Sequence, residues 1–171
     1  MNPVNHLAVN AAASATLSSG CTCFKLRSLT RRVTQLYDQT LSPSGLKVTQ
    51  FSVIAHARRK PGGSGAAFGP ASPPTVSELA DALFTDRTTL TRNLKPLVDA
   101  GFIKVGSGAD ARSKAVCVTS AGEAAFQAAR PLWKKAQGRM RSLAGDEQLN
   151  ALHGLIEAIL PQIEDVNEAA A

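Results

Sequence analysis

The chain has 171 residues, of which 44% are hydrophobic, so it can form one folded domain and is too apolar to be wholly disordered. It carries 19 Lys and Arg against 13 Asp and Glu. The positive excess lies in residues 21–60 and 120–142, whereas residues 143–171 hold six acidic residues and no Lys or Arg. A basic body with an acidic tail favours a polyanionic partner over an acidic substrate.

Simple patterns exclude several protein classes. The longest apolar runs fall far short of the roughly 20 residues that a membrane-spanning helix needs. Residues 1–20 contain no Lys, no Arg and no continuous apolar block, so they do not resemble a secretory signal, and their Ala, Asn and Ser indicate a flexible arm. Three cysteines are too few for a disulfide scaffold. We therefore expect a protein of the reducing cytoplasm without a membrane partner.

Two helices are predicted in the first third of the chain. Apolar residues recur at helical spacing over residues 23–41, and Pro43 and Gly45 end that pattern. Thr49 is expected to cap a second helix. Residues 61–74 then contain Gly, Pro, Ser, Ala and one Phe but no charged residue, which predicts an extended, exposed loop. The apolar positions of the first helix are Leu26, Leu29, Val33, Leu36 and Tyr37.

The next segment has the pattern of a helix-turn-helix. Thr75 and Glu78 have the spacing of a capping box, in which side chains satisfy free amides at a helix start. A short break at residues 84–86 separates this helix from a second one, which Gly101 ends. Two short helices joined by so tight a turn indicate a helix-turn-helix. The apolar faces are Val76, Leu79, Ala80 and Leu83 in the first helix and Leu90, Leu94, Leu97 and Val98 in the second.

A β-hairpin is predicted after the helix-turn-helix. Residues 102–106 and 114–119 are rich in β-branched residues and flank a tip of Gly, Ser and Asp, so we expect them to pair. Cys117 is expected to be a packing residue on the second strand. The tip carries Arg112 and Lys114, and such a wing can place Arg in the narrow, electronegative minor groove of DNA.

Two long helices are predicted at the end of the chain. Ser120 and Glu123 have capping-box spacing and predict the start of a helix that ends near Leu143. The last helix is predicted over residues 146–167, with a kink or a local break at Pro161. Terminal helices this apolar need a partner surface, which favours a dimer.

The polar face of the second helix of the helix-turn-helix favours DNA binding, although any surface helix has a solvated polar face. Arg can make two hydrogen bonds to guanine, and Thr methyl groups can contact thymine. Thr75 and Ser77 start the preceding helix, where amides and hydroxyls favour a phosphate. The polar positions are Arg87, Thr88, Thr91, Arg92 and Lys95.

Catalytic chemistry is poorly supported by the sequence. His6, His56 and His153 are isolated and lack the spacing of metal ligands. The chain has neither a phosphate-binding Gly-rich loop with its Lys nor a Ser in a nucleophile elbow. We therefore expect no enzyme, no metal site and no cofactor.

Three motifs occur together in this chain: the stretch TVSELADALFTDRTTLTRNLKPLVDAGFIKV, Asp110 and Arg112 in the wing, and a Thr-x-x-Gly motif that begins at Thr119. In combination they resemble the MarR family of winged helix-turn-helix regulators, although residues 61–74 form a longer connection than is usual there. The resemblance implies a homodimer whose first and last two helices intertwine and whose two lobes bind a pseudo-palindromic duplex. It implies that Arg112 contacts the minor groove or the backbone. The residues that it places in the major groove are Thr88, Thr89, Thr91 and Arg92.

The same resemblance implies a repressor of nearby genes. In this family a small anion, often aromatic or phenolic, or the oxidation of a thiol commonly releases the protein from DNA. The resemblance implies a ligand pocket where the first, second and long helices meet, near Phe51, His56 and Trp133.

The cysteines give an alternative to the ligand hypothesis. The sequence around Cys23 is similar to the organic hydroperoxide resistance regulators of this family, where a cysteine at this place is the peroxide-reactive thiol and tyrosines hold it. Tyr37 matches one of those tyrosines, and the others have no counterpart because the chain has one tyrosine. Lys25 and Arg27 near a helix N-terminus favour a reactive thiolate at Cys21 or Cys23.

The sequence thus predicts a mainly α protein with a small β-hairpin wing. We predict a sequence-specific DNA-binding homodimer that represses nearby genes and is released by a small organic ligand. The alternatives are an oxidant-sensing repressor that uses Cys23, and a winged-helix module that docks on protein without binding DNA. The expected regions are an arm at 1–20, a helical dimerisation region at 21–45 and 120–171, and a winged helix-turn-helix domain at 46–119 with an extended loop at 61–74.

Overall fold

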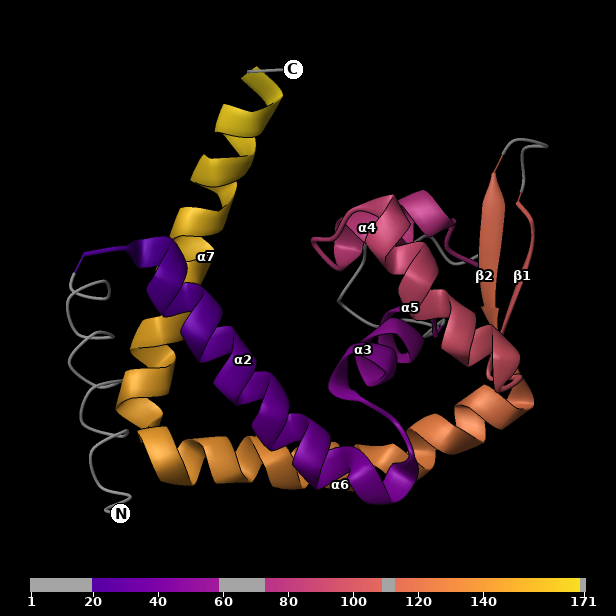
Figure 1. Cartoon of the computed structure of the whole chain (residues 1–171), viewed down its shortest axis with the longest axis horizontal. Helices are drawn as coiled ribbons and strands as arrows, with labels where there is room; N and C mark the ends of the chain where they lie inside the picture. The colour runs from indigo at the N-terminus through magenta and orange to yellow at the C-terminus, as the bar shows by residue number, and fades with distance from the viewer. Residues whose placement is uncertain (1–19, 59–72, 109–112, 170–171) are drawn as a thin grey trace, which may run out of the picture.

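The computed structural model describes residues 20–58, 73–108 and 113–169, with side chains as far as residue 163. It confirms the expected class, helices with one small hairpin (Figure 1). The predicted arm, most of the predicted 61–74 loop and the tip of the wing lie outside the described residues. The elements are α2 (Thr22–Leu41), the 3-10 turn η1 (Ser42–Ser44), α3 (Val48–Ala57), α4 (Val76–Ala82), α5 (Arg87–Asp99), β1 (Ile103–Ser107), β2 (Lys114–Val118), α6 (Ser120–Ala144) and α7 (Asp146–Ala169).

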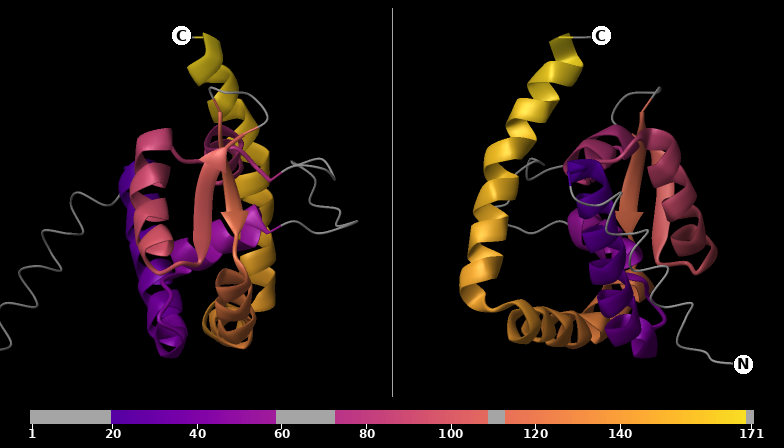
Figure 2. Two further views of the ribbon diagram at one scale, coloured as in Figure 1. Left: turned by 90° about the vertical axis from the view of Figure 1, so that its right-hand side faces the viewer. Right: turned by 60° about the vertical axis from the view of Figure 1, so that its left-hand side comes forward.

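The elements form two groups. Helices α3, α4 and α5 pack with the β1–β2 hairpin into one body, which we call the winged lobe. The long helices α2, α6 and α7 lie beside it (Figure 1). Helix α6 starts under the hairpin and is crossed by α2, and α7 leaves its far end and stands apart from the winged lobe (Figure 2). The largest fully buried side chains are Leu41, Ile54, Leu79, Leu90, Leu97, Ile103, Val53 and Val116.

The junction of α2 and α3 differs from the prediction. Helix α2 ends before Pro43 and Gly45 as predicted, but Thr49 does not cap α3. Asp38 of α2 accepts the amide of Val48 at 2.8 Å, and the Gln50 side chain accepts the amide of Lys47 at 2.9 Å. A carboxylate from another helix therefore satisfies the first amide of α3, and the N-cap is Lys47, two positions before Thr49.

The start of α6 also differs from the predicted capping box at Ser120 and Glu123. The N-cap is Thr119, whose hydroxyl oxygen accepts the amide of Gly122 at 3.0 Å and donates to the carbonyl of Gly101 at 2.7 Å. Glu123 does not fold back on the helix start, because it pairs with Arg58 of α3. The Thr-x-x-Gly motif is thus a joint between α6 and the base of the wing.

Gly122 allows the closest backbone approach in that joint. A Cβ atom added there would lie 2.0 Å from the carbonyl oxygen of Phe102 and 3.0 Å from the Val118 side chain. No side chain larger than hydrogen fits at this distance, so the hairpin and α6 are in direct contact.

The hairpin pairs as predicted, to within one residue at each end. Its antiparallel register joins Ile103 to Val118 and Ser107 to Lys114. The chain before α4 adds a short third segment that the sequence pattern does not indicate. The Pro74 carbonyl accepts the amide of Val116 at 2.8 Å, and Thr75 forms a bridge with Ala115.

Helix α7 remains helical through Pro161, so the local break predicted there is wrong. Proline removes one helical hydrogen bond, and here it lies on an exposed stretch where the freed carbonyl can meet water. Among the described residues, no helix is both long enough and apolar enough to cross a membrane.

Helices α2 and α7 leave a large apolar surface uncovered. The exposed residues are Phe24, Leu26 and Leu29 in α2 and Leu155, Ile156, Ile159, Leu160 and Ile163 in α7. Patches of this size on a soluble domain mark an interaction site. The second half of α2 differs, because Tyr37 and Leu41 are buried.

Candidate nucleic-acid interface

The turn between α4 and α5 orients the polar face of α5. Asp86 is the N-cap, and its carboxylate accepts the amide of Thr89 at 2.8 Å. Hydrogen bonds from the Thr89 side chain and then from the Thr89 amide lower the pKa of Asp86. Leu90, Leu94 and Leu97 are buried and anchor the opposite face of α5. The predicted tight turn and the end of α5 at Gly101, whose φ is +71°, are both confirmed.

The predicted base-reading side chains lie together on the exposed face of α5. Thr91 donates its hydroxyl to the carbonyl of Arg87 at 2.7 Å. Lys95 pairs with Asp99 at 2.8 Å, and both side chains are largely exposed, so this bridge opens at little cost. The exposed residues of this face are Arg87, Thr88, Thr89, Thr91, Arg92 and Lys95.

The wing lies beside this face. Lys114 is exposed at the start of β2, whereas Arg112 and Asp110 lie outside the described residues. A groove of about 410 Å³ separates α5 from the wing, with an apolar floor and basic groups around it. Cations from the helix and the wing therefore converge on one surface. The groove is lined by Val76, Arg87, Thr91, Leu94, Lys95, Val98, Asp99, Val105 and Lys114.

The start of α4 contains the predicted capping box. The Glu78 amide donates to the Thr75 hydroxyl at 3.2 Å, and the Thr75 amide donates to the Glu78 carboxylate at 2.7 Å. The hydrogen bond from the Thr75 amide, and then the one from the Thr75 hydroxyl, lower the pKa of the Glu78 carboxyl. Because Thr75 already faces a carboxylate, the partly exposed Ser77 is the better candidate of the two for a phosphate contact.

The three residues predicted near a ligand pocket are not all brought together. Phe51 is buried and stacks on Trp133 with ring centroids 5.8 Å apart. His56 is exposed, and its Nδ1 lies 2.8 Å from the carbonyl oxygen of Ser52. Phe51 and Trp133 therefore fill the space between α3 and α6, while His56 lies on another face of α3.

The three cysteines are free and exposed. Cys21 and Cys23 lie at the start of α2, whereas Tyr37 is buried fourteen positions later, about 21 Å along the same helix. Cys23 and Tyr37 therefore cannot touch within one chain. Burial raises the pKa of Tyr37. Cys117 does not pack in the core as predicted, because it points to the solvent-facing side of β2.

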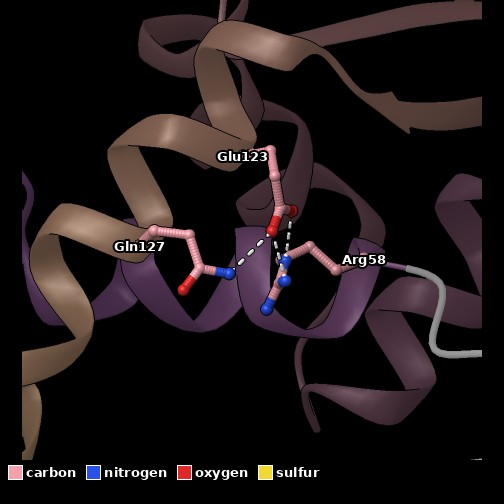
Figure 3. Close-up of polar contacts among 3 residues, drawn as sticks. All are labelled: Arg58, Glu123 and Gln127. Carbon is pink, nitrogen blue, oxygen red and sulfur yellow. Dashed lines mark hydrogen bonds and ion pairs between the residues drawn. The ribbon is translucent and has the colours of Figure 1, made fainter.

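The structure adds an ion pair that the sequence does not indicate. Arg58 at the end of α3 and Glu123 in the first turn of α6 form two hydrogen bonds, and Gln127 donates to the same carboxylate at 2.8 Å (Figure 3). The bonds from Arg58 and then from Gln127 lower the pKa of Glu123. The pair is 65 positions apart in the chain, so no local pattern could predict it.

Comparison with known proteins identifies the family. The MarR family profile matches residues 44–113. The transcriptional regulator MosR of Mycobacterium tuberculosis, solved in complex with DNA, is 36% identical over 88% of this chain and 96% of its own, with a TM-score of 0.63. A mutant of Escherichia coli MarR in complex with operator DNA is 23% identical over 80% of this chain and 91% of its own, with a TM-score of 0.66.

A third similar structure is BpsR of Bordetella bronchiseptica, which is 19% identical over 84% of this chain and 96% of its own, with a TM-score of 0.68. No curated protein sequence matches significantly. At identities of 19% and 23% the second and third structures support the fold alone. MosR, at 36% identity over nearly its whole length, shows more: the chain belongs to the MarR family of transcriptional regulators.

Proposed function

We propose that the protein is a homodimeric transcriptional regulator that binds a pseudo-palindromic duplex. The observation that carries this proposal is the exposed face of α5, where Arg87, Thr88 and Arg92 stand together with Lys114 of the wing beside them. Arg and Thr at the front of such a helix suit base edges in the major groove. MosR, which is 36% identical and was solved in complex with DNA, supports the same role.

The dimer follows from the uncovered apolar surface of the terminal helices. Leu155, Ile159 and Ile163 of α7 are about half exposed or more. A second copy of the chain can cover them with its own α2 and α7, which makes the interface two-fold symmetric. Two-fold symmetry in turn requires half-sites about one helical turn of DNA apart, roughly 34–36 Å.

We infer that the regulator is a repressor of nearby genes and that a small aromatic anion releases it. In BpsR, 6-hydroxynicotinic acid regulates DNA binding. In this chain the aromatic side chains Phe51 and Trp133 lie between the winged lobe and α6, where an aromatic ligand would change how the two pack. A titration of aromatic acids that leaves both Trp133 fluorescence and DNA affinity unchanged would argue against this effector.

Oxidant sensing by Cys23 is the second candidate, because the Cys21 and Cys23 thiols are both exposed at the N-terminal end of α2. Tyr37 of the same chain lies too far along α2 to contact the Cys23 thiol. Loss of DNA binding after treatment with an organic hydroperoxide, absent in Cys23→Ser, would select this mechanism.

The first experiment is binding to duplexes tiled across the gene's own neighbourhood, at two salt concentrations. Tight binding to one pseudo-palindrome that weakens steeply with salt supports the regulator, because Lys and Arg contacts with phosphate release counterions. The same fold could instead dock on a protein. Uniformly weak binding to every duplex would favour that alternative.

A further inference from the structure

Four side chains form a continuous stack between the winged lobe and α6. The Arg58 guanidinium carbon lies 3.9 Å from the ring centre of Phe126. Phe126 stacks on Phe51 with centroids 4.8 Å apart and planes 13° apart, and Phe51 stacks on Trp133. We call these four residues the junction ladder. Phe51 comes from α3 and Arg58 directly follows its last residue, while the other two residues come from α6.

The Arg58–Glu123 pair closes one end of the junction ladder. The guanidinium donates two hydrogen bonds to the carboxylate, and Gln127 holds the carboxylate from the other side (Figure 3). The Arg58 side chain is 18% exposed, against 72% for Arg141 in the surface pair with Asp146. A two-pronged, partly buried pair is more rigid than an exposed one, so Arg58 holds α3 at a defined place on α6.

The junction ladder spans a weak point of α6. Pro131 lies inside this helix, where it cannot donate to the carbonyl of Gln127 and its ring crowds that carbonyl. Proline is a common cause of helix kinks, and the two halves of α6 do not lie on one line in Figure 1. Phe126 precedes Pro131 and Trp133 follows it, while Phe51 touches both rings. Helix α3 therefore clamps both sides of the bend.

The bend separates two parts with different roles. The first half of α6 is fixed to the winged lobe, since Gly122 contacts the backbone of Phe102. The second half packs on α2, beside the apolar surface that the dimer would cover. The angle at Pro131 thus determines where α5 stands relative to its copy in the partner.

We propose that the junction ladder and the Arg58–Glu123 pair are positioning elements that fix the bend of α6 at Pro131 and so determine the half-site spacing that the dimer accepts. This inference rests on the proposed function. From Pro131 to Ser120 the helix is about 16 Å long. A change of about 10° at the bend therefore moves each lobe by about 3 Å, close to the 3.4 Å rise of one base pair. A loose junction would tolerate wrong spacings.

The experiment measures affinity against spacing. The probe is a series of duplexes with two copies of the half-site that the wild-type protein selects from random-sequence DNA, set from two base pairs closer to two base pairs wider than the selected spacing. For the wild type, affinity falls on both sides of the optimum. In Arg58→Met, which keeps the aliphatic stem, the ratio of affinities between the best and the neighbouring spacings falls about 2- to 30-fold.

Controls separate positioning from stability. Both affinities come from one sample, so a loss of folded protein lowers both and leaves their ratio unchanged. Glu123→Gln should lower the ratio as Arg58→Met does. Arg141→Met removes an exposed pair and should keep the wild-type ratio. Pro131→Ala should displace the optimum spacing. An unchanged ratio in Arg58→Met overturns the inference. A wild-type protein that binds all spacings equally also overturns it but leaves DNA binding intact, whereas one that binds no duplex overturns the proposed function itself.

Discussion

Helices of the winged lobe and the terminal helices both carry an apolar stripe, but the two regions differ in how far one chain buries it. In the winged lobe Leu79, Leu90 and Leu97 are fully buried within one chain, and the starts of α4 and α5 are capped by the lobe's own side chains. In α7 Leu155 and Ile163 are more than half exposed. An apolar stripe shows that a helix needs a partner surface, and the structure shows whether one chain supplies it. The lobe buries its apolar stripes within one chain, whereas the stripe of α7 stays exposed in a single chain.

The same substitution in both regions gives the largest expected contrast. Leu90→Ala should lower the free energy of unfolding by about 2–5 kcal/mol, because it leaves a cavity in a closed core. Leu155→Ala should change the unfolding of the separated chain by no more than about 0.5 kcal/mol and instead weaken self-association. Urea titrations at several protein concentrations, with sedimentation, distinguish the two. If Leu155→Ala lowered the free energy of unfolding by the same amount at every protein concentration, α7 would be covered within its own chain.

Gly122→Ala tests the contact that joins the hairpin to α6. Its methyl group would meet the Phe102 carbonyl, so the wing base or the helix must shift, at a cost of about 1–3 kcal/mol of stability. Gly138→Ala is the matched control on the same helix. A Cβ atom there meets nothing within 4 Å, and alanine favours helix by up to about 1 kcal/mol. Thermal unfolding that ranks both variants alike would contradict the close approach at Gly122.

Arg92→Ala leaves both regions folded and tests the exposed face of α5 alone. We expect a loss of about 1–3 kcal/mol of binding free energy on the cognate duplex and a smaller loss on random duplex, with relaxed specificity. Lys114→Ala should weaken binding to the cognate and the random duplex similarly, and should reduce the number of counterions released on binding by about one. Arg139→Ala removes a charge from α6 and serves as the control. Equal losses on both duplexes would make Arg92 a phosphate contact.

Local sequence patterns predicted most elements of the winged lobe but few of the contacts that join the lobe to α2 and α6. The capping box of Thr75, the short break between α4 and α5 and the pairing of the two hairpin strands depend on residues near one another in the chain, so spacing alone predicts them. Thr49 and Ser120 were wrong as helix starts because long-range partners decide those positions. Asp38 crosses from α2 to cap α3, and Arg58 draws Glu123 away from the start of α6.

The candidate site divides in the same way. The polar face of α5 follows from helical periodicity, because every third or fourth residue shares a side. The separation of His56 from Phe51 and Trp133, the exposure of Cys117 and the junction ladder depend on how α3, β2 and α6 meet. Contacts between residues 65 positions apart leave no periodic trace in one sequence.

Phe84→Gly should strengthen the winged lobe slightly. Phe84 has a φ of +49° and is 69% exposed, so its ring gains little burial while its backbone adopts a conformation that disfavours side chains. Glycine removes that strain and loses some chain entropy, for a net gain of up to about 1 kcal/mol in unfolding free energy. A clear loss in chemical denaturation would show that the ring makes a stabilising contact.

The smallest expected effect concerns the joint between the two regions and depends on pH. Arg58 lowers the pKa of Glu123, so the pair stabilises the folded chain above the ordinary glutamate pKa of about 4.3 and loses that contribution as pH falls through the lower folded value. The Glu123 side chain is 44% exposed, which limits the contribution to under about 1 kcal/mol. Glu123→Gln should therefore be less stable than the wild type at pH 7 and approach it as pH falls through the lowered pKa of Glu123. In an Arg58→Met background the same substitution should have a smaller pH-dependent effect, because the principal cause of the shift is gone. A stability difference that grows as pH falls would reverse the sign and show that Glu123 is held in its protonated form.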